Sequence, residues 1–238
     1  MKFVVTGAPR TGTTMFLIAL DTVENFNVYG EVLVATSKNP TKHPQAAVEN
    51  FRIKNVKTMQ KRTSKTMEQF VEWLYKTGDN VGFKFLYQHA ERFPDVRKYI
   101  KRDEIYKIHL MRKNPVKRMV SGLLNRYHHY GEGTNNVKPP VVLAGIKRAE
   151  GWDRKLERMF QCERYMKMYY EDLTKDTNTN ILDFTEVFNF FGVSDNPMVK
   201  VPTKKYGPDK LIDRVGNYDK LYEYFKKEAP EYLKYVEE

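Results

Sequence analysis

Cysteine is nearly absent from the sequence, whose 238 residues include only Cys162. A single cysteine excludes an internal disulfide and is typical of a reducing compartment. No apolar run approaches the ~20 residues that a membrane-spanning helix needs. The five histidines and the cysteine show no metal-ligand spacing, so we expect no bound metal. Met1 and Lys2 lead directly into an apolar segment and leave no room for a signal peptide. We therefore expect a soluble, cytoplasmic protein without a membrane span.

Acidic residues are scarce relative to basic ones, and the formal net charge is +11 at pH 7. Such an excess favours a polyanionic partner or serves solubility. Residues 50–67 hold six lysines and arginines and no acid. This run is either a solvated helix face or a basic lid over an anionic cofactor or an acidic acceptor. No zinc-finger spacing or aromatic RNA-binding motif accompanies the charge, so we do not expect nucleic acid as a partner.

Short apolar segments alternate with amphipathic ones along the whole chain. The hydrophobic content of 41% is typical of a globular protein, and the length suits a single domain over residues 1–238. Strands are expected at 3–5, 27–33, 81–86, 105–111 and 165–170. Helices are expected at 13–20, 66–77, 94–101, 115–127, 146–160, 181–191 and 218–225. This alternation predicts an α/β fold with a mainly parallel central sheet flanked by helices.

The segment after the first strand has the composition of an anion-binding turn. Glycines at 7 and 12 flank a turn that leads into a helix starting at Thr13. Unpaired amides and the dipole at a helix N-terminus favour a phosphate group. The glycine spacing fits a nucleotide-binding P-loop, but such a loop continues with Lys and then Ser or Thr, where this chain has Thr13 and Thr14. Arg10 is the only cation in the turn, which argues against an ordinary ATPase or kinase.

A second candidate segment follows the strand expected at 105–111. Arg112 stands at the carboxyl end of that strand, where open α/β sheets bind ligands. Ser121 lies nine positions further on, within the helix that Asn114 and Pro115 introduce. A guanidinium group binds phosphate through charge-assisted hydrogen bonds, and a hydroxyl adds one more.

Both segments resemble motifs of sulfotransferases that use 3′-phosphoadenosine 5′-phosphosulfate (PAPS), in the bacterial or phage type. Pro-Arg-Thr-Gly-Thr-Thr at 9–14 resembles the family's 5′-phosphosulfate loop, and the stretch from Arg112 to Ser121 resembles its 3′-phosphate motif. The resemblance implies a P-loop-like fold and a PAPS site that includes Arg10, Thr11, Gly12, Thr13, Thr14, Arg112 and Ser121. Other members place one residue fewer between the arginine and the serine, so Lys113 is an alternative to Arg112.

Two weaker matches point to the same family. Tyr-Glu-Asp-Leu at 170–173 resembles a segment whose tyrosine lies near the adenine, which implies that role for Tyr170. The segment 213–219 resembles the Asn-Tyr-Asp segment near the family's C-terminus. The basic loop before it contains Lys204 and Lys205, where the family closes over its cofactor, although the family's Arg-Lys-Gly form is absent.

The resemblance also implies catalytic residues. Glu31, after Gly30, matches the catalytic carboxylate of bacterial members and is expected to be the base. Lys84 resembles a lysine beside the cofactor, and Arg10 would stabilise developing charge. His89 and His109 remain alternative bases.

The expected reaction is therefore in-line transfer of a sulfonate group from PAPS to an acceptor hydroxyl. The product nucleotide would be 3′-phosphoadenosine 5′-phosphate (PAP), and no metal would be needed. The acceptor would be a sugar, a glycolipid or a small alcohol, with or without acidic groups, and loops at 35–65 and 126–145 would select it. Two alternatives stay open, namely a P-loop nucleotide-dependent kinase and a noncatalytic polyanion-binding module.

Overall fold

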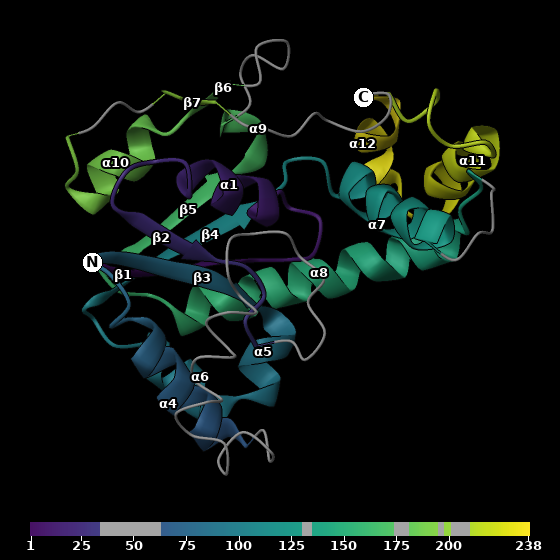
Figure 1. Ribbon diagram of the computed structural model, residues 1–238. Coiled ribbons are helices and arrows are strands. Elements are labelled where there is room, and N and C mark those ends of the chain that lie inside the picture. The colour runs from purple at the N-terminus through teal and green to yellow at the C-terminus, as the bar shows by residue number, and fades with distance from the viewer. Residues whose placement is uncertain (34–62, 130–134, 174–180, 195–197, 201–209) are drawn as a thin grey trace.

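A five-stranded, fully parallel sheet forms the centre of the protein (Figure 1). The computed structural model describes residues 1–33, 63–129, 135–173, 181–194, 198–200 and 210–238. The strands are β1 (Lys2–Gly7), β2 (Phe26–Tyr29), β3 (Asn80–Leu86), β4 (Ile105–Met111) and β5 (Tyr165–Tyr169). The predicted α/β class with a parallel sheet is confirmed.

The strand order β2-β3-β1-β4-β5 places the first strand in the middle of the sheet. After β1 the chain continues toward β2 on one side, whereas β4 and β5 lie on the other. Loops therefore leave the carboxyl ends of β1 and β4 in opposite directions. Open α/β sheets bind ligands at such a switch point. The predicted loop at 9–14 follows β1, and Arg112 follows β4, so both lie at this edge.

Helices cover both faces of the sheet because the β1 side chains alternate between two buried clusters. Phe3 and Val5 pack toward α1 (Thr13–Leu20) and α10 (Thr185–Phe191). Val4 packs on the opposite face, which α4 (Ser64–Leu74), α5 (Tyr87–Arg92), α6 (Pro94–Ile100) and α8 (Pro139–Met159) cover (Figure 1). All three β1 side chains are fully buried. The strand therefore anchors the loop that follows it from both sides.

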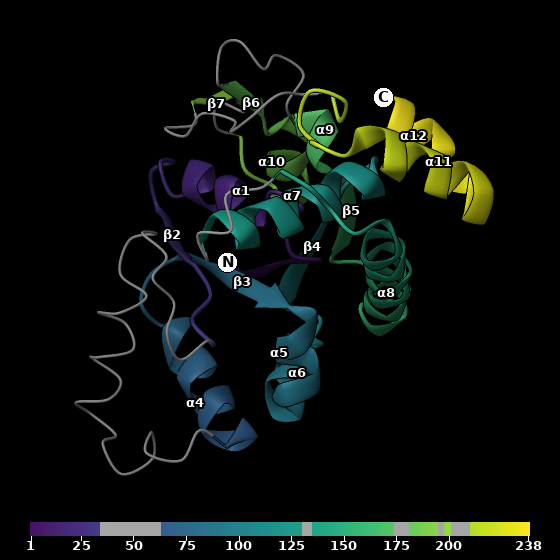
Figure 2. The ribbon, with the colours of Figure 1, turned by 90° about the vertical axis from the view of Figure 1, so that its right-hand side faces the viewer.

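A third apolar cluster joins α7 (Pro115–His129) and α8 to the C-terminal helices (Figure 2). These are α11 (Tyr218–Glu228), the 3-10 helix η1 (Pro230–Tyr232) and α12 (Leu233–Glu237). Asn114 caps the start of α7, since its Oδ1 accepts the Lys117 N–H at 2.8 Å. Its Nδ2 donates to the Tyr235 carbonyl at 2.8 Å. The helix that carries Ser121 is thereby fixed at its first turn.

The single helix predicted at 181–191 is wrong. Ile181–Asp183 forms β6, which pairs antiparallel with β7 (Met198–Lys200), and α10 starts only at Thr185. The Asp183 carboxylate accepts the Thr185 N–H at 2.9 Å, which separates strand from helix. The helix does end at Gly192, whose φ of 69° is left-handed, as the sequence predicts.

Three further expectations differ in detail. Tyr170 begins α9 (Tyr170–Leu173) and does not end a strand, and α5 was not expected. The strand expected at 27–33 is 26–29, and residues 35–62 of the loop expected at 35–65 lie outside the described residues. The single-domain organisation of residues 1–238 stays a prediction. Among the described residues, no helix is long and apolar enough to cross a membrane.

Candidate functional site

The loop between β1 and α1 has the backbone geometry of an anion site. Gly12 is the N-cap of α1 with φ of 88°, and no side chain caps the helix. The amides of its first turn are therefore left for a ligand. The Thr11 hydroxyl donates to the Ala8 carbonyl at 2.8 Å and closes the loop on itself. Arg10 also has a left-handed φ of 70°, which is uncommon for a residue with a side chain and is typical of functional loops.

Two arginines converge beside this helix N-terminus. Partial burial of its guanidinium group, and then the nearby charge of Arg112, lower the pKa of Arg10 from its usual value. Nη2 of Arg10 lies 3.5 Å from the Ser121 hydroxyl on α7. Two like charges repel each other, and an anion bound between them would offset that repulsion. The loop, the end of β4 and α7 thus meet at one positively charged place.

Tyr170 packs between the loop and Arg112. The guanidinium carbon of Arg112 lies 4.3 Å from the centre of the Tyr170 ring, in cation–π contact. On the loop side, a Cβ added to Gly12 would lie 2.1 Å from Cδ2 of Tyr170. Only glycine therefore fits at position 12, both for its positive φ and for the approach of the ring.

Glu31 and Lys84 form an ion pair on the other side of the loop. Nζ of Lys84 lies 2.6 Å from Oε1 of Glu31 and 3.2 Å from the Thr14 hydroxyl in the first turn of α1. The Lys84 side chain is 8% exposed and that of Glu31 23% exposed. Oε2 of Glu31 has no hydrogen-bond partner within the described residues. The pair therefore leaves one carboxylate oxygen available close to the anion site.

Neither histidine named as an alternative base has a nitrogen free to accept a proton. Nδ1 of His89 accepts the Leu86 N–H at 3.0 Å, so Nε2 carries the ring proton. Burial lowers the pKa of His89 to about 4, against a raising effect of Glu31. His109 is 0% exposed, with Nδ1 2.8 Å from the Tyr165 hydroxyl and Nε2 3.2 Å from Asp153. Glu31 is therefore the remaining candidate for the catalytic base, and this role stays a prediction.

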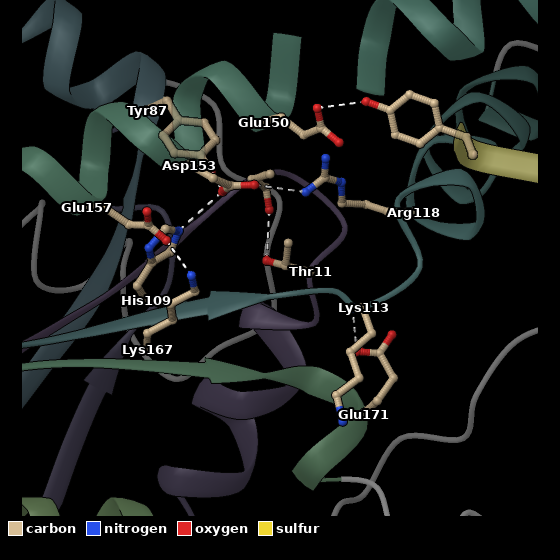
Figure 3. Close-up of polar contacts among 12 residues, drawn as sticks. Thr11, Tyr87, His109, Lys113, Arg118, Glu150, Asp153, Glu157, Lys167 and Glu171 are labelled. Carbon is tan, nitrogen blue, oxygen red and sulfur yellow. Dashed lines mark hydrogen bonds and ion pairs between the residues drawn. The ribbon is translucent and has the colours of Figure 1, made fainter. Parts of the chain in front are cut away.

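Sequence reasoning missed a buried polar hub centred on Asp153 of α8 (Figure 3). Its carboxylate accepts hydrogen bonds from the Tyr87 hydroxyl and from Nε2 of His109. Nη1 of Arg118 lies 3.3 Å from its Oδ2. These partners come from α5, β4 and α7. His89 also lies on α5 and Ser121 on α7, and Arg112 directly follows β4. The signal in the sequence was an aspartate on the apolar face of a helix.

The comparisons with known proteins concern the fold. No protein-family model matches the sequence, and no curated protein matches it. A sulfotransferase from Alicyclobacillus acidocaldarius superposes with a TM-score of 0.53 at 14% identity, covering 99% of this chain and 95% of that one. The sulfotransferase domain from the curacin biosynthetic pathway matches with a TM-score of 0.46 at 11% identity, covering 82% and 75%.

The chain has a sulfotransferase fold. At this low identity the likeness concerns the arrangement of elements alone. It does, however, agree with the fold that the motifs at 9–14 and 112–121 imply.

The structure brings most of the predicted site residues together at one edge of the sheet. Arg10, Gly12, Arg112, Ser121 and Tyr170 are linked by the contacts above, as are Thr14, Lys84 and Glu31. Thr11 and Thr13 are buried in the loop and in the first turn of α1. Lys204 and Lys205 lie outside the described residues, as does most of the basic run at 50–67. Among the residues that are described, no group of His, Cys, Asp or Glu could hold a metal ion.

We expect Asp153→Asn to destabilise the protein by about 2 kcal/mol, because the buried Arg118 guanidinium would lose its counter-charge. Glu150→Gln is the matched control on the same helix, since an amide can still accept the Tyr232 hydroxyl hydrogen bond, which is 2.8 Å long. Urea unfolding of the two variants checks this prediction. Equal midpoints for both would show that the hub adds no stability.

The same hub predicts an acid dependence. Burial alone would raise the pKa of Asp153, but hydrogen bonds from His109 and Tyr87 and the charge of Arg118 outweigh it, so the pKa lies below its usual 3.8. A carboxyl whose pKa is lower in the folded chain contributes its full stability above its unfolded pKa. It loses that stability as the pH falls from the unfolded pKa through the folded pKa. The difference in stability between wild type and Asp153→Asn should therefore shrink below about pH 4.

Proposed function

We propose that this chain is a PAPS-dependent sulfotransferase that acts on an acceptor hydroxyl. The observation that carries the proposal is the convergence of Arg10 and Arg112 on the uncapped N-terminus of α1. Two guanidinium groups and a row of free amides make a site for an anion with more than one charged group. The sulfotransferase fold of the chain supports this choice among nucleotides.

The residues present fit a nucleotide that carries phosphate groups at both the 3′ and the 5′ position of its ribose. Arg112 and Ser121 would hold the 3′-phosphate, and the Tyr170 ring beside Arg112 offers a surface for the adenine. The amides that follow Gly12, with Arg10, Thr13 and Thr14, would hold the 5′-phosphosulfate. Thr13 stands where a P-loop that binds triphosphates has its lysine, which favours PAPS over ATP.

When bound, PAPS supplies a sulfonate group on a phosphate leaving group. The acceptor oxygen would bond to sulfur while the bond from sulfur to the bridging oxygen breaks, and PAP would leave. Oε2 of Glu31 would take the acceptor proton. Arg10 and the loop amides would stabilise the charge that moves onto the bridging oxygen. Lys84 would hold the Glu31 carboxylate in place and place a further positive charge beside the loop.

The test is turnover of PAPS with a panel of sugars, glycolipids and small alcohols, followed as PAP release by chromatography. We expect PAP to form with at least one class of hydroxyl acceptor, and the rate to fall sharply in Arg10→Ala. If PAPS is not consumed in any reaction and the protein turns over ATP in the presence of magnesium, this proposal is wrong. Those results would favour the nucleotide-dependent kinase.

A further inference from the structure

The two segments that carry Arg112 and Tyr170 are joined residue by residue. Oε1 of Glu171 lies 3.3 Å from Nε of Arg112, and Oε2 of Glu171 accepts the Lys113 N–H at 3.0 Å. Nζ of Lys113 donates to Asp172, the next residue of α9. Figure 3 shows Glu171 lying against Lys113 at the end of β4. Each oxygen of Glu171 thus contacts a different residue at the carboxyl end of that strand.

This arrangement holds the Arg112 side chain on two sides. Glu171 contacts Nε, and the Tyr170 ring covers one face of the guanidinium group. The side chain is only 16% exposed. Its two terminal amino groups have no hydrogen-bond partner within the described residues. Those amino groups form the planar fork with which arginine binds phosphate.

We propose that Glu171 is a positioning residue that presents the free end of Arg112 to the 3′-phosphate of the nucleotide. This inference rests on the proposed function. A carboxylate near a phosphate site opposes binding by repulsion, so its position there calls for a compensating gain. The gain is a fixed side chain, because a flexible arginine loses rotamer entropy when it binds a ligand, and an arginine that is already held in place does not.

The test compares two ligands that differ only in the 3′-phosphate. Dissociation constants for PAP and for adenosine 5′-monophosphate (AMP) are measured by calorimetry in wild type, Glu171→Ala, Glu171→Gln and Asp172→Ala. The ratio of the AMP constant to the PAP constant reports what the 3′-phosphate contributes. A general loss of folding changes both constants and leaves this ratio unchanged.

We expect Glu171→Ala to lower the ratio about tenfold, entirely through weaker PAP binding. Glu171→Gln should give an intermediate ratio, because one amide oxygen can replace only one of the two carboxylate contacts. Asp172→Ala should keep the wild-type ratio, since Asp172 contacts Lys113 and has no contact with Arg112.

An unchanged ratio in Glu171→Ala would overturn the inference. So would a higher one, which would mean that Glu171 competes with the phosphate for Arg112. A wild-type protein that binds PAP no better than AMP would instead contradict the proposed function itself.

Discussion

Replacing Arg112 by alanine should weaken PAP binding on the order of 100-fold, while AMP binding changes by less than about threefold. The reason is that Arg112 would make two charge-assisted hydrogen bonds to the 3′-phosphate, and AMP lacks that group. Truncation also removes the cation that stacks on Tyr170, whose ring would remain for the adenine. Calorimetric titration with both nucleotides measures the two effects separately.

Lys113→Ala is the matched control for this prediction. Lys113 is the neighbouring cation, but it is exposed and paired with Asp172. We expect its removal to change PAP affinity only slightly. If Lys113→Ala weakened PAP binding and Arg112→Ala did not, Lys113 would be the cation of the 3′-phosphate motif, with one residue fewer between it and Ser121. An equal loss for PAP and AMP in Arg112→Ala would show that the arginine does not recognise the 3′-phosphate.

Glu31→Gln should reduce turnover on the order of 10²- to 10⁴-fold without changing the dissociation constant for PAP. The amide keeps the size of the side chain and a hydrogen bond to Lys84, but it cannot accept a proton from the acceptor hydroxyl. Single-turnover transfer from PAPS, measured beside PAP titration, distinguishes loss of the base from loss of the nucleotide site.

Turnover of His89→Asn, compared with that of Glu31→Gln, tests whether a histidine is the catalytic base. An asparagine oxygen can take the Leu86 N–H that Nδ1 of His89 accepts, so the start of α5 should be preserved. The geometry predicts that this variant keeps most of its turnover. Loss of turnover in His89→Asn together with retention in Glu31→Gln would assign the base to histidine.

The main features of the fold could be predicted from the sequence because they are local. Strands such as 81–86 and 105–111 are short apolar runs, and the helix faces follow from spacing alone. The loop at 9–14 also has a local signature, since its glycines and threonines define an anion-binding turn without reference to the rest of the chain. The strand ends then place Arg112 beside that loop, because carboxyl ends of parallel strands share one edge.

Features that depend on distant partners could not be predicted. Residues 181–183 pair with 198–200, and a segment of three residues, of which only Ile181 and Leu182 are apolar, does not distinguish that strand from a helix. The hub at Asp153 needs the positions of three other elements. The proton position on His89 follows from a contact with a backbone amide, which composition and spacing do not show.

The most direct test of this account is calorimetric titration of the wild-type protein with PAP in the absence of magnesium, with ATP as the comparison. We predict a dissociation constant on the order of micromolar for PAP, weaker binding of ATP, and PAP binding weakened on the order of 100-fold in Arg112→Ala. Absence of PAP binding, or a preference for ATP that requires magnesium, would contradict the assignment of this loop and strand end to a PAPS site.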